Sequence, residues 1–130
     1  MTSAAKPSTI RREIRLEVRF LEAVLRRCPG NEMAIEALAH LYTRIGRFHD
    51  GLTLDLEITR RHPADPTNWY NLACSYALTQ NKDDALQALD RAVQLGYRDT
   101  NWMMKDRDLA ALREDPRFRD LIARVALASS

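Results

Sequence analysis

The stretch Trp69-Tyr70-Asn71-Leu72-Ala73-Cys74-Ser75-Tyr76, followed by Ala85 and Leu89, decides the fold of this chain. The same pattern of apolar residues occurs one period of 34 residues earlier. Six pairs of positions match in this way: Ile35 with Trp69, Leu38 with Leu72, Ala39 with Ala73, Tyr42 with Tyr76, Ile58 with Ala92, and Pro29 with Pro63. Apolar residues at helical spacing in a repeat of this length predict stacked helical units.

The pattern Trp-x-x-Leu-Ala-x-x-Tyr at 69–76, with Ala-x-x-x-Leu at 85–89, resembles a tetratricopeptide repeat (TPR), a helix–turn–helix unit. The resemblance covers 32–99 by these motifs and 10–31 by register. It extends over 100–127 through a segment similar to those that close many bacterial repeat arrays. It implies an all-α fold, a right-handed α-α superhelix (a TPR solenoid) of about seven helices.

The repeat register predicts the organisation of the chain. We expect a disordered N-terminus at 1–9 and a single domain at 10–130. This domain divides into a half repeat at 10–31 that lacks its first helix, full repeats at 32–65 and 66–99, and a C-terminal cap at 100–127. Asn31 and Asp65 are expected to cap helix N-termini, and Gly46 to end a helix in the left-handed conformation. The first repeat is degenerate, because Gly51 replaces a small alanine where helices cross and Asp55 replaces a phenylalanine.

The cap is expected to dock on the helices at 66–79 and 82–95. Its apolar residues no longer follow the repeat register, yet the end of the second repeat needs a cover. Leu112 and Phe118 are the predicted anchors. The surface turned to solvent should carry the charged residues of this segment: Arg113, Arg117, Asp120 and Arg124.

Composition excludes several classes of protein. The chain is 45% hydrophobic and 29% charged with a net charge of +2, so neither a nucleic acid nor a membrane is expected as a partner. No long apolar run or secretory leader is visible, which predicts a cytoplasmic protein. The two cysteines lie far apart in the sequence, so a disulfide scaffold is not expected. The three histidines form no metal-ligand spacing with them, so a zinc site is not expected either. Without a phosphate-binding loop or a nucleophile elbow, we expect no enzyme activity, no metal and no cofactor.

The arginines of the first helix, at 11, 12, 15, 19 and 26, gather on one side. They could meet phosphate or an acidic partner. No aromatic residues alternate with them, and Glu22 lies among them. We therefore interpret this side as a solvated face of the N-terminal cap.

A second set of residues faces away from the predicted core of Leu38, Tyr42, Trp69, Leu72, Tyr76 and Leu89. In TPR arrays the first-helix faces line a concave groove that binds peptides, so the resemblance implies a partner-binding groove here. The candidate residues are Met33, Glu36, His40, Arg44, Thr67, Tyr70, Asn71, Cys74 and Leu78. Tyr70, Cys74 and Leu78 make the second half more apolar than a solvated face requires. This face is therefore either a ligand groove or a surface covered by the C-terminal segment or a second subunit.

The resemblance implies a non-catalytic scaffold or adaptor that binds a peptide or a partner protein in this groove. One TPR subset grips the C-terminal carboxylates of chaperone tails with Lys, Arg and Asn. Asn71 matches that set, but Glu36 and His40 replace its Lys and Asn, which argues against a chaperone-tail adaptor. Two alternatives remain: a structural module that forms a homo-oligomer, and a regulatory subunit of a separate enzyme.

Overall fold

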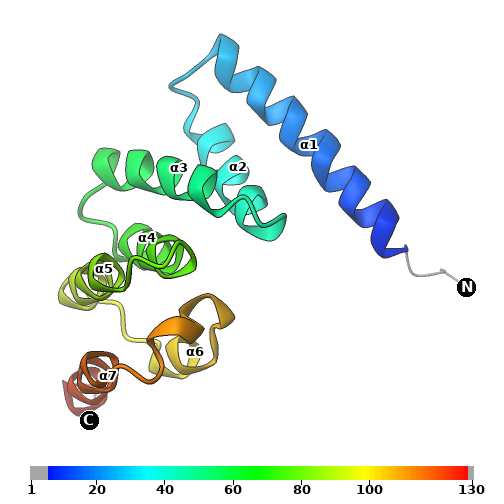
Figure 1. Cartoon of the computed structure of the whole chain (residues 1–130). Coiled ribbons are helices and arrows are strands. Elements are labelled where there is room, and N and C mark those ends of the chain that lie inside the picture. The colour runs from blue at the N-terminus through cyan, green and yellow to red at the C-terminus, as the bar shows by residue number, and fades with distance from the viewer. Residues whose placement is uncertain (1–5, 129–130) are drawn as a thin grey trace, which may run out of the picture. The chain divides into compact units, whose positions relative to one another are not determined.

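The structure is a computed structural model that describes residues 6–128, and this range contains helices and no strand. Its elements are α1 (Pro7–Arg27), α2 (Glu32–Arg44), α3 (Phe48–Arg61), α4 (Pro66–Leu78), α5 (Lys82–Gln94), α6 (Thr100–Lys105), the 3₁₀ helix η1 (Arg107–Leu112) and α7 (Pro116–Ala128) (Figure 1). The all-α class expected from the sequence is confirmed.

The first helix begins earlier than the sequence predicts. Pro7 takes one of its first two positions, where a proline lacks no hydrogen bond and its fixed φ suits the helix. Residues 7–9 are therefore helical and not disordered. Residues 1–5, the rest of the predicted disordered segment, lie outside the described residues, as do 129–130.

Local signals set the other helix ends as expected. The Asn31 side chain accepts a hydrogen bond from the amide of Ala34 at 3.1 Å, and Asp65 accepts one from the amide of Thr67 at 2.9 Å. Gly46 follows α2 with a φ of 82°, a left-handed conformation that glycine adopts without strain. Gln80 stands one period later, after α4, and adopts a φ of 65° although it carries a side chain.

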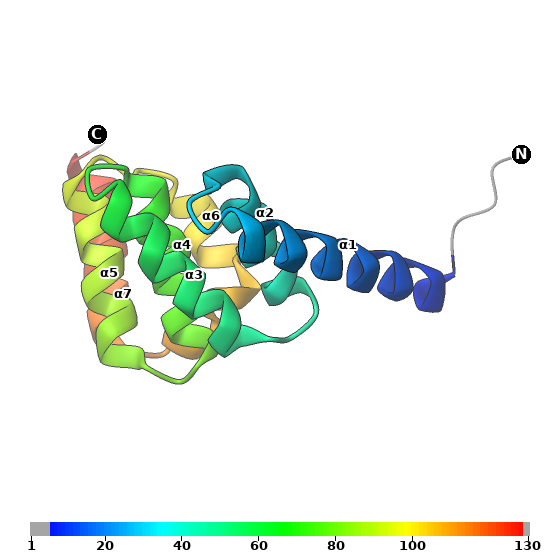
Figure 2. The same cartoon turned by 90° about the horizontal axis from the view of Figure 1, so that it is seen from above.

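The chain forms two compact units, one up to Leu54 and one from Asp55 onward, with the boundary inside α3. The core of the first unit holds Val18 of α1 with Leu38, Leu41 and Tyr42 of α2, and Leu54 packs against it. The Tyr42 hydroxyl donates a 2.7 Å hydrogen bond to Glu22, which ties α2 to α1. The N-terminal turns of α1 run on beyond α2 (Figure 2).

The second unit is built on α4 and α5, which pack side by side, with η1 against α4 and α7 against α5 (Figure 1). Leu89, Met103, Leu109 and Leu112 are each 0% exposed, and Phe118 is 3% exposed. Both predicted anchors of the C-terminal segment are thus buried. Among the predicted core residues, Trp69 and Tyr76 are only half-buried. The indole of Trp69 donates to the carbonyl of Pro63 at 2.7 Å, which explains its position at the surface.

Candidate protein-binding surface

The predicted groove residues of α2 are open to solvent. Met33, Glu36, His40 and Arg44 are all exposed, and Met33 keeps 83% of its surface. They repeat every three or four residues, so they share one side of the helix. The opposite side carries Leu38, Leu41 and Tyr42 into the core of the first unit. We call these four exposed residues the α2 face.

The predicted groove residues of α4 belong to the second unit and differ in exposure. Thr67 and Asn71 are exposed, while Leu78 is half-buried. Tyr70 and Cys74 are buried, with 5% and 7% of their surface exposed. The sequence left open whether this face is a ligand groove or a covered surface. Tyr70 and Cys74 are covered, and the C-terminal segment contributes to the cover.

Tyr70 is covered by a side chain that the sequence analysis did not single out, Asp106. The Tyr70 hydroxyl donates a hydrogen bond to Oδ2 of Asp106 at 2.7 Å, and the Cys74 thiol approaches the same oxygen at 3.7 Å. The ring of Tyr97 stacks on that of Tyr70, with centroids 4.4 Å apart and planes 4° apart. The face of α4 is thus closed by an aromatic ring and a carboxylate that come from later in the same chain.

The turn between α6 and η1 holds Asp106 in place. Oδ1 of Asp106 accepts a hydrogen bond from the amide of Asp108 at 3.0 Å, and this bond caps η1. Its backbone carbonyl accepts one from the Arg113 guanidinium at 2.8 Å. Arg113, which we expected to point to solvent with Arg117, Asp120 and Arg124, instead turns inward and satisfies this carbonyl. The other three charged residues are exposed as predicted.

Burial controls the protonation of this cluster. Desolvation raises the pKa of the Tyr70 hydroxyl, and its hydrogen bond to Asp106 raises it further. Desolvation also raises the pKa of the Cys74 thiol, and the charge of Asp106 adds to the effect. Both groups are therefore neutral donors at pH 7.

Ligand atoms of Cys74, Asp106 and Asp108 lie within 4.8 Å of one another, a spacing that a metal ion could use. Here the Cys74 thiol is instead within hydrogen-bonding distance of Oδ2 of Asp106. Both oxygens of Asp106 already accept hydrogen bonds within the chain. The arrangement therefore serves as a hydrogen-bonded clasp between α4 and η1.

Asp55, the residue that departs from the repeat pattern, also has a partner on α4. The Ser75 hydroxyl donates a hydrogen bond to its carboxylate. Desolvation raises the pKa of Asp55 from 3.8 to about 6, although the hydrogen bond from Ser75 lowers it. A polar pair thus replaces the apolar contact that the pattern would place there.

Asp106 stands directly before η1 and caps it. A polar residue directly before a helix, whose side chain accepts from an amide two or three positions later, is a local signal that a sequence displays. The reach of the second carboxylate oxygen to Tyr70 depends on how the chain returns after α5, and no local pattern encodes it.

No helix within residues 6–128 combines the length and the apolar character that a membrane span requires. Comparison of the chain with protein-family models, with curated proteins and with solved structures gave no match to any of them.

Proposed function

We propose that this protein is a non-catalytic protein-binding module and that its α2 face receives a segment of a partner protein. One observation carries the proposal. The equivalent side of α4, one 34-residue period later, already holds a segment of this chain through the carboxylate of Asp106. The same side of a repeated helix is therefore covered in one unit and open in the other.

The register makes this comparison specific. Glu36 and His40 on α2 stand at the positions of Tyr70 and Cys74 on α4. Where α4 offers a hydroxyl and a thiol to Asp106, α2 offers the imidazole of His40 and the guanidinium of Arg44. His40 and Arg44 suit a carboxylate on the bound segment, and the Glu36 carboxylate at the position of Tyr70 suits a basic group beside it. Met33, which is 83% exposed, adds an apolar contact at the other end of the face.

The resemblance to TPR repeats supports the same role, since first-helix faces bind peptides in that family. Arg44 is exposed, so its charge pair with a partner would contribute only about 0–1 kcal/mol. We therefore expect a moderate affinity that depends on the apolar contacts of Met33 as well. This suits an adaptor that exchanges partners.

The test starts with a photo-crosslinking amino acid at position 40 in the producing cells. The captured protein is then purified, and its Kd for the full chain is measured by calorimetry. His40→Glu with Arg44→Glu should weaken binding by about tenfold or more. The control is Lys105→Glu with Arg107→Glu, two exposed cations of the second unit. Equal weakening by both pairs would contradict a site on α2.

The alternative roles are separated by two further measurements. If sedimentation equilibrium gave a dimer that the α2-face variants dissociate, the protein would be a self-association module. If the purified partner were an enzyme whose rate changes on binding, the module would be its regulatory subunit.

A further inference from the structure

The outer side of α1 exposes large apolar residues that no described part of the chain covers. Leu16 and Phe20 are 55% and 65% exposed. At about 100° per residue they point away from Val18, which lies in the core against α2. We call the surface formed by Leu16 and Phe20, with Arg12 and Arg19 beside them, the outer α1 face.

The repeat register shows what this face lacks. On α3, Gly51 approaches α2 so closely that a Cβ there would lie 3.2 Å from Oγ1 of Thr43. Leu54, on the same side of α3, packs against the core of the first unit. One period earlier, these two positions are Glu17 and Phe20 of α1. Phe20 thus stands where the second helix of a repeat meets its first helix, and no helix of residues 6–128 packs on it there.

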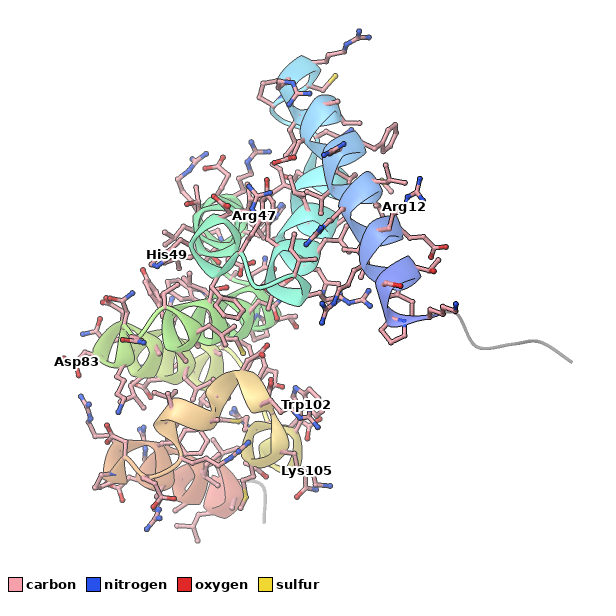
Figure 3. All side chains as sticks on the ribbon, turned by 45° about the vertical axis from the view of Figure 1, so that its right-hand side comes forward. Arg12, Arg47, His49, Asp83, Trp102 and Lys105 are labelled. Atoms are coloured by element: carbon pink, nitrogen blue, oxygen red, sulfur yellow. The ribbon has the colours of Figure 1, made fainter. Side chains whose placement is uncertain are left out.

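The arginines beside this face lack carboxylate partners within the described residues. Arg11, Arg12, Arg15 and Arg19 are exposed, and no carboxylate within residues 6–128 pairs with any of them. Their side chains and Leu16 line a shallow hollow along α1. Figure 3 shows Arg12 on this helix. Like charges one turn apart repel, so carboxylates placed opposite them would be stabilising.

We propose that the outer α1 face binds an amphipathic helix of a partner protein. This helix would place apolar side chains on Leu16 and Phe20 and carboxylates against Arg12 and Arg19. A helix bound there would take the position that the first helix of a repeat has against its second. The proposal concerns a different surface from the α2 face and does not depend on it.

Other anionic partners fit this face less well. A phosphate backbone offers no apolar groups that could pack on the exposed Leu16 and Phe20. An anionic lipid surface would meet Glu13 and Glu17, which lie on the other flank of the same apolar residues and are exposed. A helix can satisfy both flanks, because each of its positions carries its own charge.

The experiment uses the full chain and a synthetic amphipathic peptide with leucine at the a and d heptad positions. Of its e and g positions, those on the flank facing Arg12 and Arg19 carry glutamate, and those on the flank facing Glu13 and Glu17 carry lysine. Calorimetry should show binding that Phe20→Ala weakens by about tenfold or more. Arg12→Glu with Arg19→Glu should weaken it similarly, and the peptide with lysine in place of glutamate should bind this variant better than the parent. Lys105→Glu with Arg107→Glu is the charge-matched control and should change nothing. Circular dichroism verifies that each variant keeps its helices.

Four results would overturn the proposal. The first is equal binding of the glutamate and lysine peptides by the parent chain. The second is loss of binding in His40→Glu with Arg44→Glu, which would place the peptide on α2. The third is a dimer in sedimentation that Phe20→Ala dissociates, because a second copy would then occupy the face. The fourth is sedimentation with phosphatidylserine vesicles that depends on Arg12 and Arg19.

Discussion

The hydroxyl of Tyr70 on α4 donates a 2.7 Å hydrogen bond to the carboxylate of Asp106, which lies 36 residues later in the chain. This bond closes a helix face that the sequence pattern would leave open. It also fixes the turn that leads from α6 into η1, which packs on α4 and carries the buried Leu109 and Leu112. The stability of the second unit should therefore depend on this pair.

Tyr70→Phe removes the donor and keeps the ring that stacks on Tyr97. We expect a loss of about 1–3 kcal/mol in the free energy of unfolding, because a buried carboxylate loses a hydrogen bond. Urea unfolding measures it. Tyr76→Phe on the same helix is the control and should change stability by less than about 0.5 kcal/mol, since Tyr76 is only half-buried. A double-mutant cycle with Asp106→Asn would show no coupling if the bond were unimportant.

The two cysteines should differ in reactivity. Cys28 is exposed, whereas Cys74 is buried with a pKa raised by desolvation. Since the thiolate is the reactive form, a disulfide reagent at pH 8 should modify Cys28 rapidly and Cys74 only after unfolding. Absorbance of the released thiolate with the variants Cys28→Ser and Cys74→Ser assigns the phases. Rapid reaction in Cys28→Ser would show that the clasp around Cys74 opens readily.

Asp55 should make stability fall as pH rises from about 4 to 6.5. Its folded pKa, about 6, lies above the usual 3.8, so between these values the folded state holds a proton that the unfolded state has lost. The contribution to stability is complete at low pH and is lost as pH rises through 6, by about 1–3 kcal/mol.

Asp55→Asn carries no charge, yet its carbonyl can still accept from Ser75. We expect it to be more stable than the parent at pH 7.5 and nearly equal at pH 4, as measured by urea unfolding at both values. Ser75→Ala removes the donor to the carboxylate and should lower stability at pH 7.5. Parallel stability curves for the parent and Asp55→Asn would refute the assignment.

Gly46 and Gln80 allow a reciprocal test of backbone strain. Both follow a helix with positive φ, 82° and 65°, but only Gly46 adopts this conformation without cost. Gln80→Gly should therefore stabilise the protein by about 1 kcal/mol, and Gly46→Gln should destabilise it by a similar amount. A Cβ at Gly46 would meet no atom within 4 Å, so packing does not complicate the exchange. Thermal unfolding should show shifts of opposite sign.

Leu112→Ala tests the role of the C-terminal segment. Leu112 is 0% exposed in η1, which packs on both α4 and α5, so its truncation should cost about 2–5 kcal/mol. Leu127→Ala is the matched control, because Leu127 is 75% exposed and should cost less than about 0.5 kcal/mol. Equal stabilities of the two variants in urea would mean that the segment does not stabilise the unit.

The sequence by itself determined the all-helical class, the helices at 66–79 and 82–95 to within a residue, and the caps at Asn31, Asp65 and Gly46. These features depend on helical spacing and on hydrogen bonds between residues a few positions apart, which a sequence displays directly. It also indicated that Leu112 and Phe118 are buried, because large apolar residues in a terminal helical segment need a partner surface.

Only the tertiary structure decided what covers each helix face. Helical spacing placed Tyr70 and Cys74 on the side of α4 opposite Leu72, but it could not show that Asp106 and Tyr97 return to close that side. For the same reason, Arg113 was expected in solvent and instead donates to the carbonyl of Asp106. The exposure of Phe20 likewise depends on which distant segments pack on its helix. Periodicity fixes the direction of a side chain from its own helix, whereas burial depends on where distant parts of the chain fold back.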